Sequence, residues 1–196
     1  MKLIVATHNR HKVDEFRELM DQLDLDVDML PNGLPDAPED GDTFLENAEQ
    51  KAVFYSRYVD DIVVSDDSGL QVPLLDGEPG IYSARYAGVH GDDAANNAKL
   101  IGRLHEKGVR FAPARFVCAL SVCRTGKVLC SVEGHVDGTV YDIPKGANGF
   151  GYDPLFEPTG QPLRFAEMAS HEKAQYSHRA AAVRLLAGSL RELLRI

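Results

Sequence analysis

The sequence predicts an α/β fold in which a mixed β-sheet is covered by helices. In the first part of the chain, strand-like and helix-like segments alternate, which is typical of parallel strands joined by helices. Further along, two long strand-like segments flank a Thr125-Gly126 turn and indicate a hairpin, which could extend into a second lobe and leave a cleft. A chain of 196 residues with 44% hydrophobic residues can bury a sizeable core, so we expect a single domain over residues 1–196.

Apolar spacing and turn residues define the elements of the first part of the chain. The predicted strands are Leu3–Ala6, Leu25–Leu30 and Asp61–Ser65. The predicted helices run from about Val13 to Leu23, from Thr43 to about Tyr58 and from Asp92 to Lys107. Thr43 followed by Glu46 is the capping-box pattern of a helix start. The third strand is expected to turn sharply at Gly69, which places Asp66 and Asp67 at its exit.

The second part of the chain combines glycine-rich loops, a hairpin and a closing helix. Residues 77–91 are loop-like, and the helix after them is expected to bury Ala95, Ala98, Ile101 and Leu104. The hairpin strands are predicted at Ala114–Arg124 and Lys127–Tyr141. Residues 146–154 form a second glycine-rich loop, and an amphipathic helix is predicted over Ser177–Leu194.

Composition and charge exclude several classes of protein. No stretch approaches the roughly 20 apolar residues of a membrane span, and the N-terminus lacks the apolar run of a signal peptide, so we expect a cytoplasmic protein with no membrane partner. A net charge of -9 argues against a nucleic-acid binder, which needs a broad basic surface. The three cysteines lack a CxxC pair and are expected to be reduced and mostly buried.

The first candidate site is the polar turn after the first strand, Thr7-His8-Asn9-Arg10-His11-Lys12. Its hydroxyl, amide and backbone N–H groups precede a helix N-terminus, which favours anions, so the turn could hold a triphosphate. The alternative is a polar helix cap with solvated cations. The P-loop consensus is absent, and the turn alone does not decide between these interpretations.

The second candidate site gathers Asp66, Asp67 and Ser68 with Glu46. Adjacent carboxylates are costly unless they are paired, and oxygen ligands around Mg2+ are a common reason to gather them. Mg2+ would also offset the repulsion between an acidic protein and a polyanionic substrate, and a carboxylate not fully occupied by the metal could accept a proton from an attacking water. The alternatives are an Asx-type turn for the aspartates and a capping box for Glu46.

The third candidate site is Phe150-Gly151-Tyr152-Asp153, with Lys173 and His178-Arg179 downstream. An aromatic ring beside glycine can stack on a base, and cationic donors suit the acceptors of a base edge or a phosphate. The alternatives are a buried aromatic turn for Phe150 and Tyr152, and a helix start with exposed charges for His178 and Arg179.

Taken together, the motifs resemble the inosine triphosphate pyrophosphatase family, which acts on aberrant purine nucleoside triphosphates. The matching segments are Thr7-His8-Asn9 with Lys12, Thr43 to Ala48, Ser65 to Leu70, Gly80 to Gly88, Phe150 to Asp153 and Ser177 to Arg179. They span nearly the whole chain, and their joint occurrence is more specific than any one of them. The resemblance implies an elongated mixed sheet flanked by helices, two lobes around a central active-site cleft, and a homodimer. It also implies Mg2+-dependent hydrolysis of ITP, dITP and XTP to the monophosphate and pyrophosphate.

The resemblance further implies a role for each matching residue. Asp67 would be the proton acceptor and a metal ligand, with Glu46 and Asp66 as further metal ligands. The phosphates would be held by Thr7, His8, Asn9, Arg10, His11 and Lys12, and the rest of the nucleotide by Ser68, Phe150, Gly151, Tyr152, Asp153, Lys173, His178 and Arg179. Phe150 would stack on the base. Donors from Lys173, His178 and Arg179 would favour the 6-oxo group of hypoxanthine or xanthine over the 6-amino group of adenine.

Two residues depart from the family's pattern, and two other functions fit the same motifs. His8 stands where the family usually has glycine, and Ala180 follows Arg179 where glycine is common. These departures concern rate and fine specificity more than the reaction class. The other functions are hydrolysis of modified pyrimidine nucleotides on a similar fold and non-catalytic sensing of purine nucleotides. A sensor would not need a water-activating carboxylate.

Overall fold

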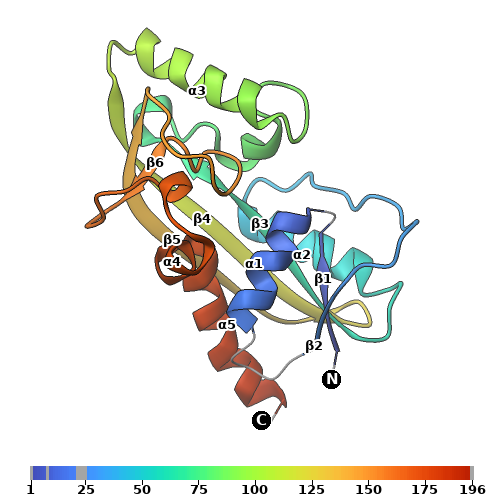
Figure 1. The fold of residues 1–196 in the computed structure, drawn as a ribbon. Helices are drawn as coiled ribbons and strands as arrows, with labels where there is room; N and C mark the ends of the chain where they lie inside the picture. The colour runs from blue at the N-terminus through green and yellow to red at the C-terminus, as the bar shows by residue number, and fades with distance from the viewer. Residues whose placement is uncertain (1, 8, 21–25, 195–196) are drawn as a thin grey trace. The chain divides into compact units, whose positions relative to one another are not determined.

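The computed structural model describes residues 2–7, 9–20 and 26–194. It confirms the predicted α/β fold, with six strands in one mixed sheet of order β2-β1-β3-β4-β5-β6 and helices alongside it (Figure 1). Strand β1 pairs in parallel with β2 and β3, while β5 and β6 are antiparallel. Within the described ranges, no helix is both long and apolar enough to cross a membrane.

The elements largely follow the predicted order. The strands are β1 (Lys2–Ala6), β2 (Asp26–Met29), β3 (Ile62–Gln71), β4 (Phe111–Arg124), β5 (Lys127–Tyr141) and β6 (Phe156–Pro158). The helices are α1 (Arg10–Met20), α2 (Phe44–Tyr55), α3 (Asp93–Glu106), α4 (Ser170–Tyr176) and α5 (His178–Leu194). The short helical turns η2 (Pro73–Leu75), η3 (Gly80–Arg85) and η4 (Phe165–Glu167) were not predicted, nor were β6 and α4.

The chain divides into two compact units. Unit 1 comprises Met1–Asp67, Cys118–Gly134 and Arg179–Ile196, and unit 2 comprises Ser68–Val117 and His135–His178. The chain passes from one unit to the other within β3, β4 and β5 and at the start of α5. The single domain over residues 1–196 and the cleft between two lobes stay predictions.

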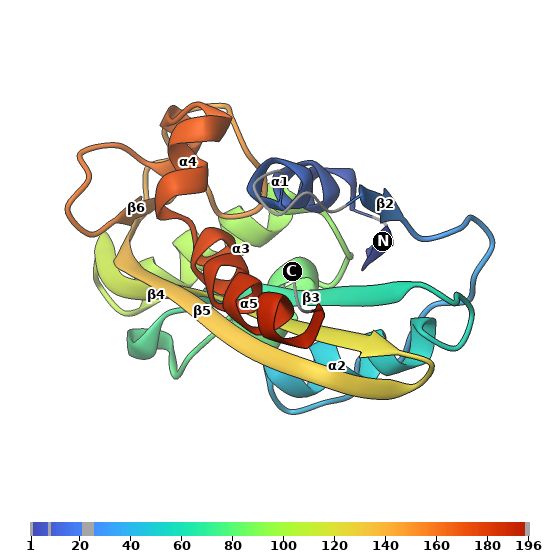
Figure 2. The ribbon, with the colours of Figure 1, turned by 90° about the horizontal axis from the view of Figure 1, so that it is seen from below.

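In unit 1, alternate residues of the strands pack against helices on opposite faces. Leu3 and Val5 of β1 join a core that includes residues of α1 and α5. Ile4 and Ala6 join a second core with Tyr55 of α2. This alternation is what the pleat of a strand dictates when both faces are covered. Figure 2 shows α1 and α2 on opposite sides of β3.

Helix α5 approaches β5 closely at Gly134, again within unit 1. A Cβ atom on Gly134 would lie 2.7 Å from the Cα atom of Ala182, closer than side chains pack. The absence of a side chain at Gly134 therefore lets α5 bury Ala182, Leu186 and Leu190 against the sheet.

Unit 2 has its own core, which is built around aromatic rings. The ring of Phe116 lies 4.6 Å from that of Phe156, which is 5.3 Å from the ring of Phe165. Leu100 and Leu104 of α3 are fully buried in the same core.

The hairpin and the helix caps are confirmed. Thr125 and Gly126 both have positive φ, 50° and 78°, as a two-residue type I′ hairpin turn requires. Thr43 caps α2, and Glu46 completes the capping box. Helix α2 ends at Tyr55 rather than near Tyr58.

The prediction that the third strand ends before Asp66 is wrong. Strand β3 continues through Asp66, Asp67 and Gly69 to Gln71. The physical reason is that Leu70, like the later Val72, is fully buried in the core of unit 2, so the extended backbone is held on both sides of the aspartates.

Smaller differences affect α1 and α3. Helix α1 begins at Arg10 rather than near Val13, and the predicted helix end at Leu23 lies outside the described residues. In α3, Asn96 is buried in place of the predicted Ala95 and Ala98. Its Nδ2 atom donates to the carbonyl oxygen of residue 84 and its Oδ1 atom accepts from the N–H of residue 87, so Asn96 is held by hydrogen bonds to the loop backbone rather than by apolar packing.

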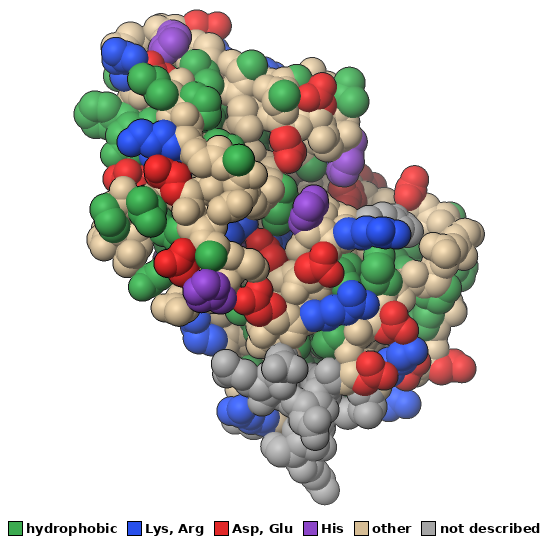
Figure 3. Space-filling model, in the orientation of Figure 1, with side chains coloured by type: hydrophobic (Ala, Val, Ile, Leu, Met, Phe, Trp, Pro, Cys, Tyr) green, Lys and Arg blue, Asp and Glu red, His purple; other side chains and the backbone are tan. Residues whose placement is uncertain are grey.

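Charged side chains of both signs are interspersed on the surface. The face shown in Figure 3 has no broad basic area among the residues described. This distribution agrees with the net charge of -9. The three cysteines are unpaired by disulfides, as predicted.

Candidate active site

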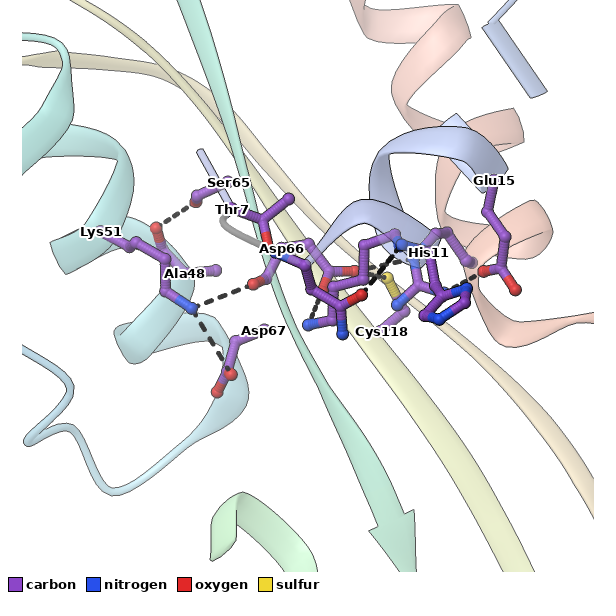
Figure 4. Close-up of polar contacts among 12 residues, drawn as sticks. Thr7, His11, Glu15, Ala48, Lys51, Ser65, Asp66, Asp67 and Cys118 are labelled. Carbon is purple, nitrogen blue, oxygen red and sulfur yellow. Dashed lines mark hydrogen bonds and ion pairs between the residues drawn. The ribbon is translucent and has the colours of Figure 1, made fainter. Parts of the chain in front are cut away.

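The two adjacent aspartates of β3 point in different directions. Because successive residues of a strand face opposite sides of a sheet, Asp66 and Asp67 cannot share one environment. Figure 4 shows the Asp66 side chain directed toward α1 and the Asp67 side chain directed toward Lys51 of α2. The two carboxylates are therefore separate groups with separate roles.

Asp66 is a fully buried anion enclosed by donors. One carboxylate oxygen forms an ion pair with Lys12, and the other accepts hydrogen bonds from Arg179 Nε at 3.0 Å and Cys118 Sγ at 3.1 Å. Burial favours the neutral carboxyl, but the charges of Arg179 and Lys12 outweigh it and hold the pKa of Asp66 well below its usual value. Asp66 is thus ionised throughout the neutral range.

Arg179 extends this network to a second carboxylate. Its guanidinium is completely buried and also pairs with Glu15 of α1. The pairs Lys12–Asp66 and Arg179–Glu15 together balance charge beneath α1, which is the condition for burying ions at tolerable cost. Arg179 is therefore committed to the interior of unit 1, and these contacts argue against the predicted role of Arg179 as a base donor.

Asp67 lies in a different setting. Its Oδ1 atom is 3.9 Å from Lys51 Nζ, and its Oδ2 atom is buried without a hydrogen-bond partner among the residues that the structure describes. Burial raises the pKa of Asp67 to about 6, although the positive charges of Lys51 and Lys12 oppose the shift. Such a carboxylate is ionised at neutral pH and is a moderately strong base.

Lys51 is a buried cation that links the two aspartates. Its Nζ atom donates to the backbone oxygen of Asp66 at 3.1 Å and pairs with Glu39 at 2.5 Å. Burial alone would lower the pKa of Lys51, but Asp67 and Glu39 raise it above the usual value. Lys51 therefore stays protonated beside Asp67.

The polar turn before α1 is organised as a helix N-terminus. Asn9 Oδ1 accepts from the backbone N–H groups of His11 at 3.0 Å and Lys12 at 3.4 Å, and Thr7 Oγ1 accepts from the N–H of Asn9. The side chains of Arg10 and His11 are exposed, and His8 lies outside the described residues. The helix-cap interpretation is correct for Asn9, and the anion-favouring N-terminus remains beside Lys12.

The predicted metal ligands are only partly placed for that role. Glu46 Oε2 accepts from the N–H groups of Asp42 and Thr43, as the capping-box alternative requires. Among the described residues, no three or more His, Cys, Asp or Glu side chains converge as a ready-made metal site. Both oxygens of Asp66 already have donors, so its contacts do not favour the predicted metal-ligand role. Mg2+ commonly uses only one or two carboxylates together with substrate phosphates, and the open oxygen of Asp67 fits that arrangement.

Unit 2 brings together three residues predicted to hold the base. Lys173 Nζ lies 4.8 Å from the centroid of the Phe150 ring and donates to Asp153 Oδ2 at 2.6 Å. The same Asp153 oxygen accepts from the backbone N–H of Phe150 at 3.0 Å. Phe150 is half-buried, so one aromatic surface and one buried cation are held together by Asp153.

Other residues predicted to bind the base make internal contacts within unit 2. Tyr152 is buried, and its hydroxyl donates to the backbone oxygen of Ser83 at 2.8 Å, so the buried-turn interpretation is correct for Tyr152. His178 is also buried, and its ring stacks on Phe116 at 4.7 Å. His178 and Arg179 do begin helix α5, as the alternative interpretation has it, but both side chains are buried, so its expectation of exposed charges is wrong. Ser68 is half-buried in β3.

Comparison with known proteins decides the family. A model of the Ham1 family matches residues 3–189. The chain belongs to the Ham1 family. Its fold is that of the Staphylococcus aureus Ham1 protein, with a TM-score of 0.84, 36% identity, and coverage of 98% of this chain and 99% of that one.

Relatives of the Ham1 chain carry a functional name. A protein of Exiguobacterium sibiricum named dITP/XTP pyrophosphatase is 44% identical, with 99% of both chains covered. A Bacillus subtilis protein of the same name is 44% identical, with 93% of both chains covered. A solved Mycobacterium abscessus structure, titled nucleoside-triphosphatase / dITP/XTP pyrophosphatase, has a TM-score of 0.73 at 38% identity and covers 95% of this chain and 98% of that one.

Two residues that the structure places in this Ham1 site are not predicted by the sequence motifs. Lys51 belongs to the buried face of α2, at helical spacing from Ala48 and Tyr55. A lysine on an apolar stripe is a signal that could have been noticed, because a buried lysine needs partners. Glu15 gave no such signal, since a carboxylate in the second turn of a helix is ordinary.

Proposed function

We propose that this chain hydrolyses aberrant purine nucleoside triphosphates such as ITP, dITP and XTP to the monophosphate and pyrophosphate. The observation that carries the proposal is Asp67, a carboxylate with one buried oxygen without a hydrogen-bond partner among the described residues and a pKa raised to about 6. The name shared by relatives that match nearly the full chain supports the substrate class.

Asp67 is the general base in this proposal. A base works best when its pKa is near the working pH, because it is then ionised and still accepts a proton readily. Asp67 takes a proton from the water that attacks the α-phosphorus, directly or with help from a bound metal. Lys51, protonated and 3.9 Å away, offsets the negative charge that accumulates beside it.

The phosphates are held by positive groups of unit 1. Lys12 and the N-terminus of α1 supply a cation and a favourable dipole for the departing pyrophosphate. Asp66 orients Lys12 through their ion pair and is itself held by Arg179. Asp66 and Arg179 act here through other residues rather than by touching substrate.

Mg2+ is the proposed cofactor, held by Asp67 and the substrate phosphates. Glu46 is a further metal ligand that the family resemblance implies. When bound, it would neutralise phosphate charge and polarise the attacked phosphoryl group. Removing divalent metal with EDTA should abolish turnover, and adding Mg2+ should restore it. Unchanged activity in EDTA would contradict the metal requirement.

Base recognition is assigned to Phe150 and Lys173 of unit 2. The ring of Phe150 offers a surface for stacking, worth about 1–3 kcal/mol per base in comparable sites. The ammonium of Lys173 can donate to a 6-oxo group but not accept from a 6-amino group, which favours hypoxanthine and xanthine over adenine. We also propose that the chain forms a homodimer, which light scattering after size-exclusion chromatography would test.

The function is tested by incubating the protein with Mg2+ and dITP, dATP or dGTP in parallel and measuring pyrophosphate. We expect pyrophosphate from dITP, little from the other two, and none from Asp67→Asn. Asp61→Asn, the same change at an exposed carboxylate just before β3, is the matched control and should remain active. Faster turnover of modified pyrimidine nucleotides, or tight dITP binding without turnover, would contradict the proposal.

A further inference from the structure

The backbone on both sides of Phe150 is held by carboxylates. The N–H of Phe150 donates to Asp153 Oδ2 at 3.0 Å, and the N–H of Gly151 donates to Asp93 Oδ2 at 2.7 Å. These two N–H groups belong to the peptide planes that flank Phe150. Since φ and ψ of Phe150 are the rotations between those planes, the two hydrogen bonds fix the direction in which its side chain leaves the backbone.

A second residue of α3 holds the next peptide group. Asn97, one turn after Asp93, donates from Nδ2 to the backbone oxygen of Gly151 at 2.9 Å. Gly151 has a φ of 62°, a conformation that glycine adopts without strain. The loop is thus clamped to the first two turns of α3 through both backbone groups of Gly151.

Asn97 makes this contact at a cost to stability. Its Oδ1 atom is buried, and the described residues offer it no hydrogen-bond partner. A buried acceptor without a partner is unfavourable, and such local conflicts are expected where a residue is retained for function. An apolar residue at this position would avoid that cost but could not hold Gly151.

We propose that Asp93 and Asn97 are positioning residues for Phe150, which hold its ring in the orientation that stacks on the purine base. The inference rests on the proposed function, because it takes Phe150 as the stacking surface. A surface held in place before binding loses less conformational entropy when the base arrives, so the clamp strengthens substrate binding. The carboxylate of Asp93 and the amide of Asn97 both belong to α3, and a helix is a rigid support for a loop.

The conformational part can be measured without any turnover. The chain has no tryptophan, so Phe150→Trp introduces a single tryptophan as the fluorescent reporter at residue 150. We expect Asp93→Ala in this background to lower the fluorescence anisotropy of the reporter and to increase its quenching by acrylamide. Asp92→Asn, the neighbouring acid that caps α3 through the N–H of Ala95, removes the same charge and is the control. It should leave both signals unchanged.

The kinetic part separates positioning from general damage. Because a well-placed base stack is worth about one to two powers of ten in binding, we expect Asp93→Ala or Asn97→Ala to raise the KM for dITP roughly 10-fold with kcat nearly unchanged. Asp93→Asn keeps an acceptor for the N–H of Gly151, so its KM for dITP should stay close to the wild-type value. In a Phe150→Ala background, Asp93→Ala should raise KM less than about 2-fold, because the ring that it positions is gone.

Each outcome decides a different claim. Unchanged anisotropy in Asp93→Ala would overturn the clamp whatever the activity, as would the same rise in KM with and without Phe150. A wild-type protein that releases no pyrophosphate from dITP would instead contradict the proposed function, while the reporter would still decide whether α3 fixes residue 150.

Discussion

Asp67→Asn is expected to stabilise the metal-free protein at pH 8 while it abolishes turnover. The pKa of Asp67 is about 6 in the folded chain, against an ordinary value of 3.8. The difference is about 2 pKa units, and each unit corresponds to about 1.4 kcal/mol, so ionised Asp67 costs the fold up to about 3 kcal/mol. Asparagine resembles the protonated form and removes that cost. Only 14% of the side chain is exposed, so solvent screens little of it.

The sign of the pH dependence follows from the raised pKa. Below pH 3.8, Asp67 is protonated in both the folded and the unfolded chain, and the substitution should have little effect on the free energy of unfolding. As pH rises from that value through about 6, wild type loses stability that the variant keeps, so the gap between them widens and then levels off.

Urea denaturation of wild type and Asp67→Asn between pH 4 and pH 8, in the presence of EDTA, measures this gap. EDTA is needed because a bound cation would itself favour the ionised carboxylate. Asp61→Asn, at an exposed site, should stay within about 0.5 kcal/mol of wild type throughout. Equal or lower stability of Asp67→Asn at pH 8, or a gap independent of pH, would refute the assignment of Asp67 as a carboxylate ionised against its surroundings.

Three further predictions concern the buried network, the packing of α5 and the pH profile. Arg179→Met leaves Asp66 buried with one cation fewer, and should lower the free energy of unfolding in urea by about 3–5 kcal/mol; a loss below about 1 kcal/mol would contradict the network. Gly134→Ala brings a Cβ atom to 2.7 Å from the Cα atom of Ala182 and should cost about 1–3 kcal/mol. Gly102→Ala, in open space on α3, should instead gain about 0.5–1 kcal/mol. Because Asp67 must be ionised to accept a proton, kcat/KM for dITP should fall toward acid with a midpoint no higher than about pH 6.

The parts of the fold that were predictable from sequence depend on short-range rules. The capping box of Thr43 and Glu46 and the turn at Thr125-Gly126 follow from residues within a few positions of one another. The continuation of β3 through Asp66 does not, because it is Leu70, in the core of unit 2, that keeps the strand extended. A glycine after two aspartates favours a turn only where packing does not override it.

The candidate site shows the same division. The grouping of Phe150, Asp153 and Lys173 was expected from the motifs, and the structure brings them together. The burial of Arg179 was not, because its partners Asp66 and Glu15 are far away in sequence and no local pattern links them. Spacing in the sequence can identify the residues of a site, but it gives less information about the contacts that each of them makes.

In the proposed reaction, water activated by Asp67 attacks the α-phosphorus of an aberrant purine triphosphate. Hydrolysis of dITP with Mg2+ in water labelled with heavy oxygen, followed by mass spectrometry of the products, shows which phosphorus is attacked. We predict that the label enters dIMP and that the accompanying pyrophosphate is unlabelled. Label in pyrophosphate, or release of orthophosphate with dIDP, would show attack at another phosphorus and contradict the proposed reaction.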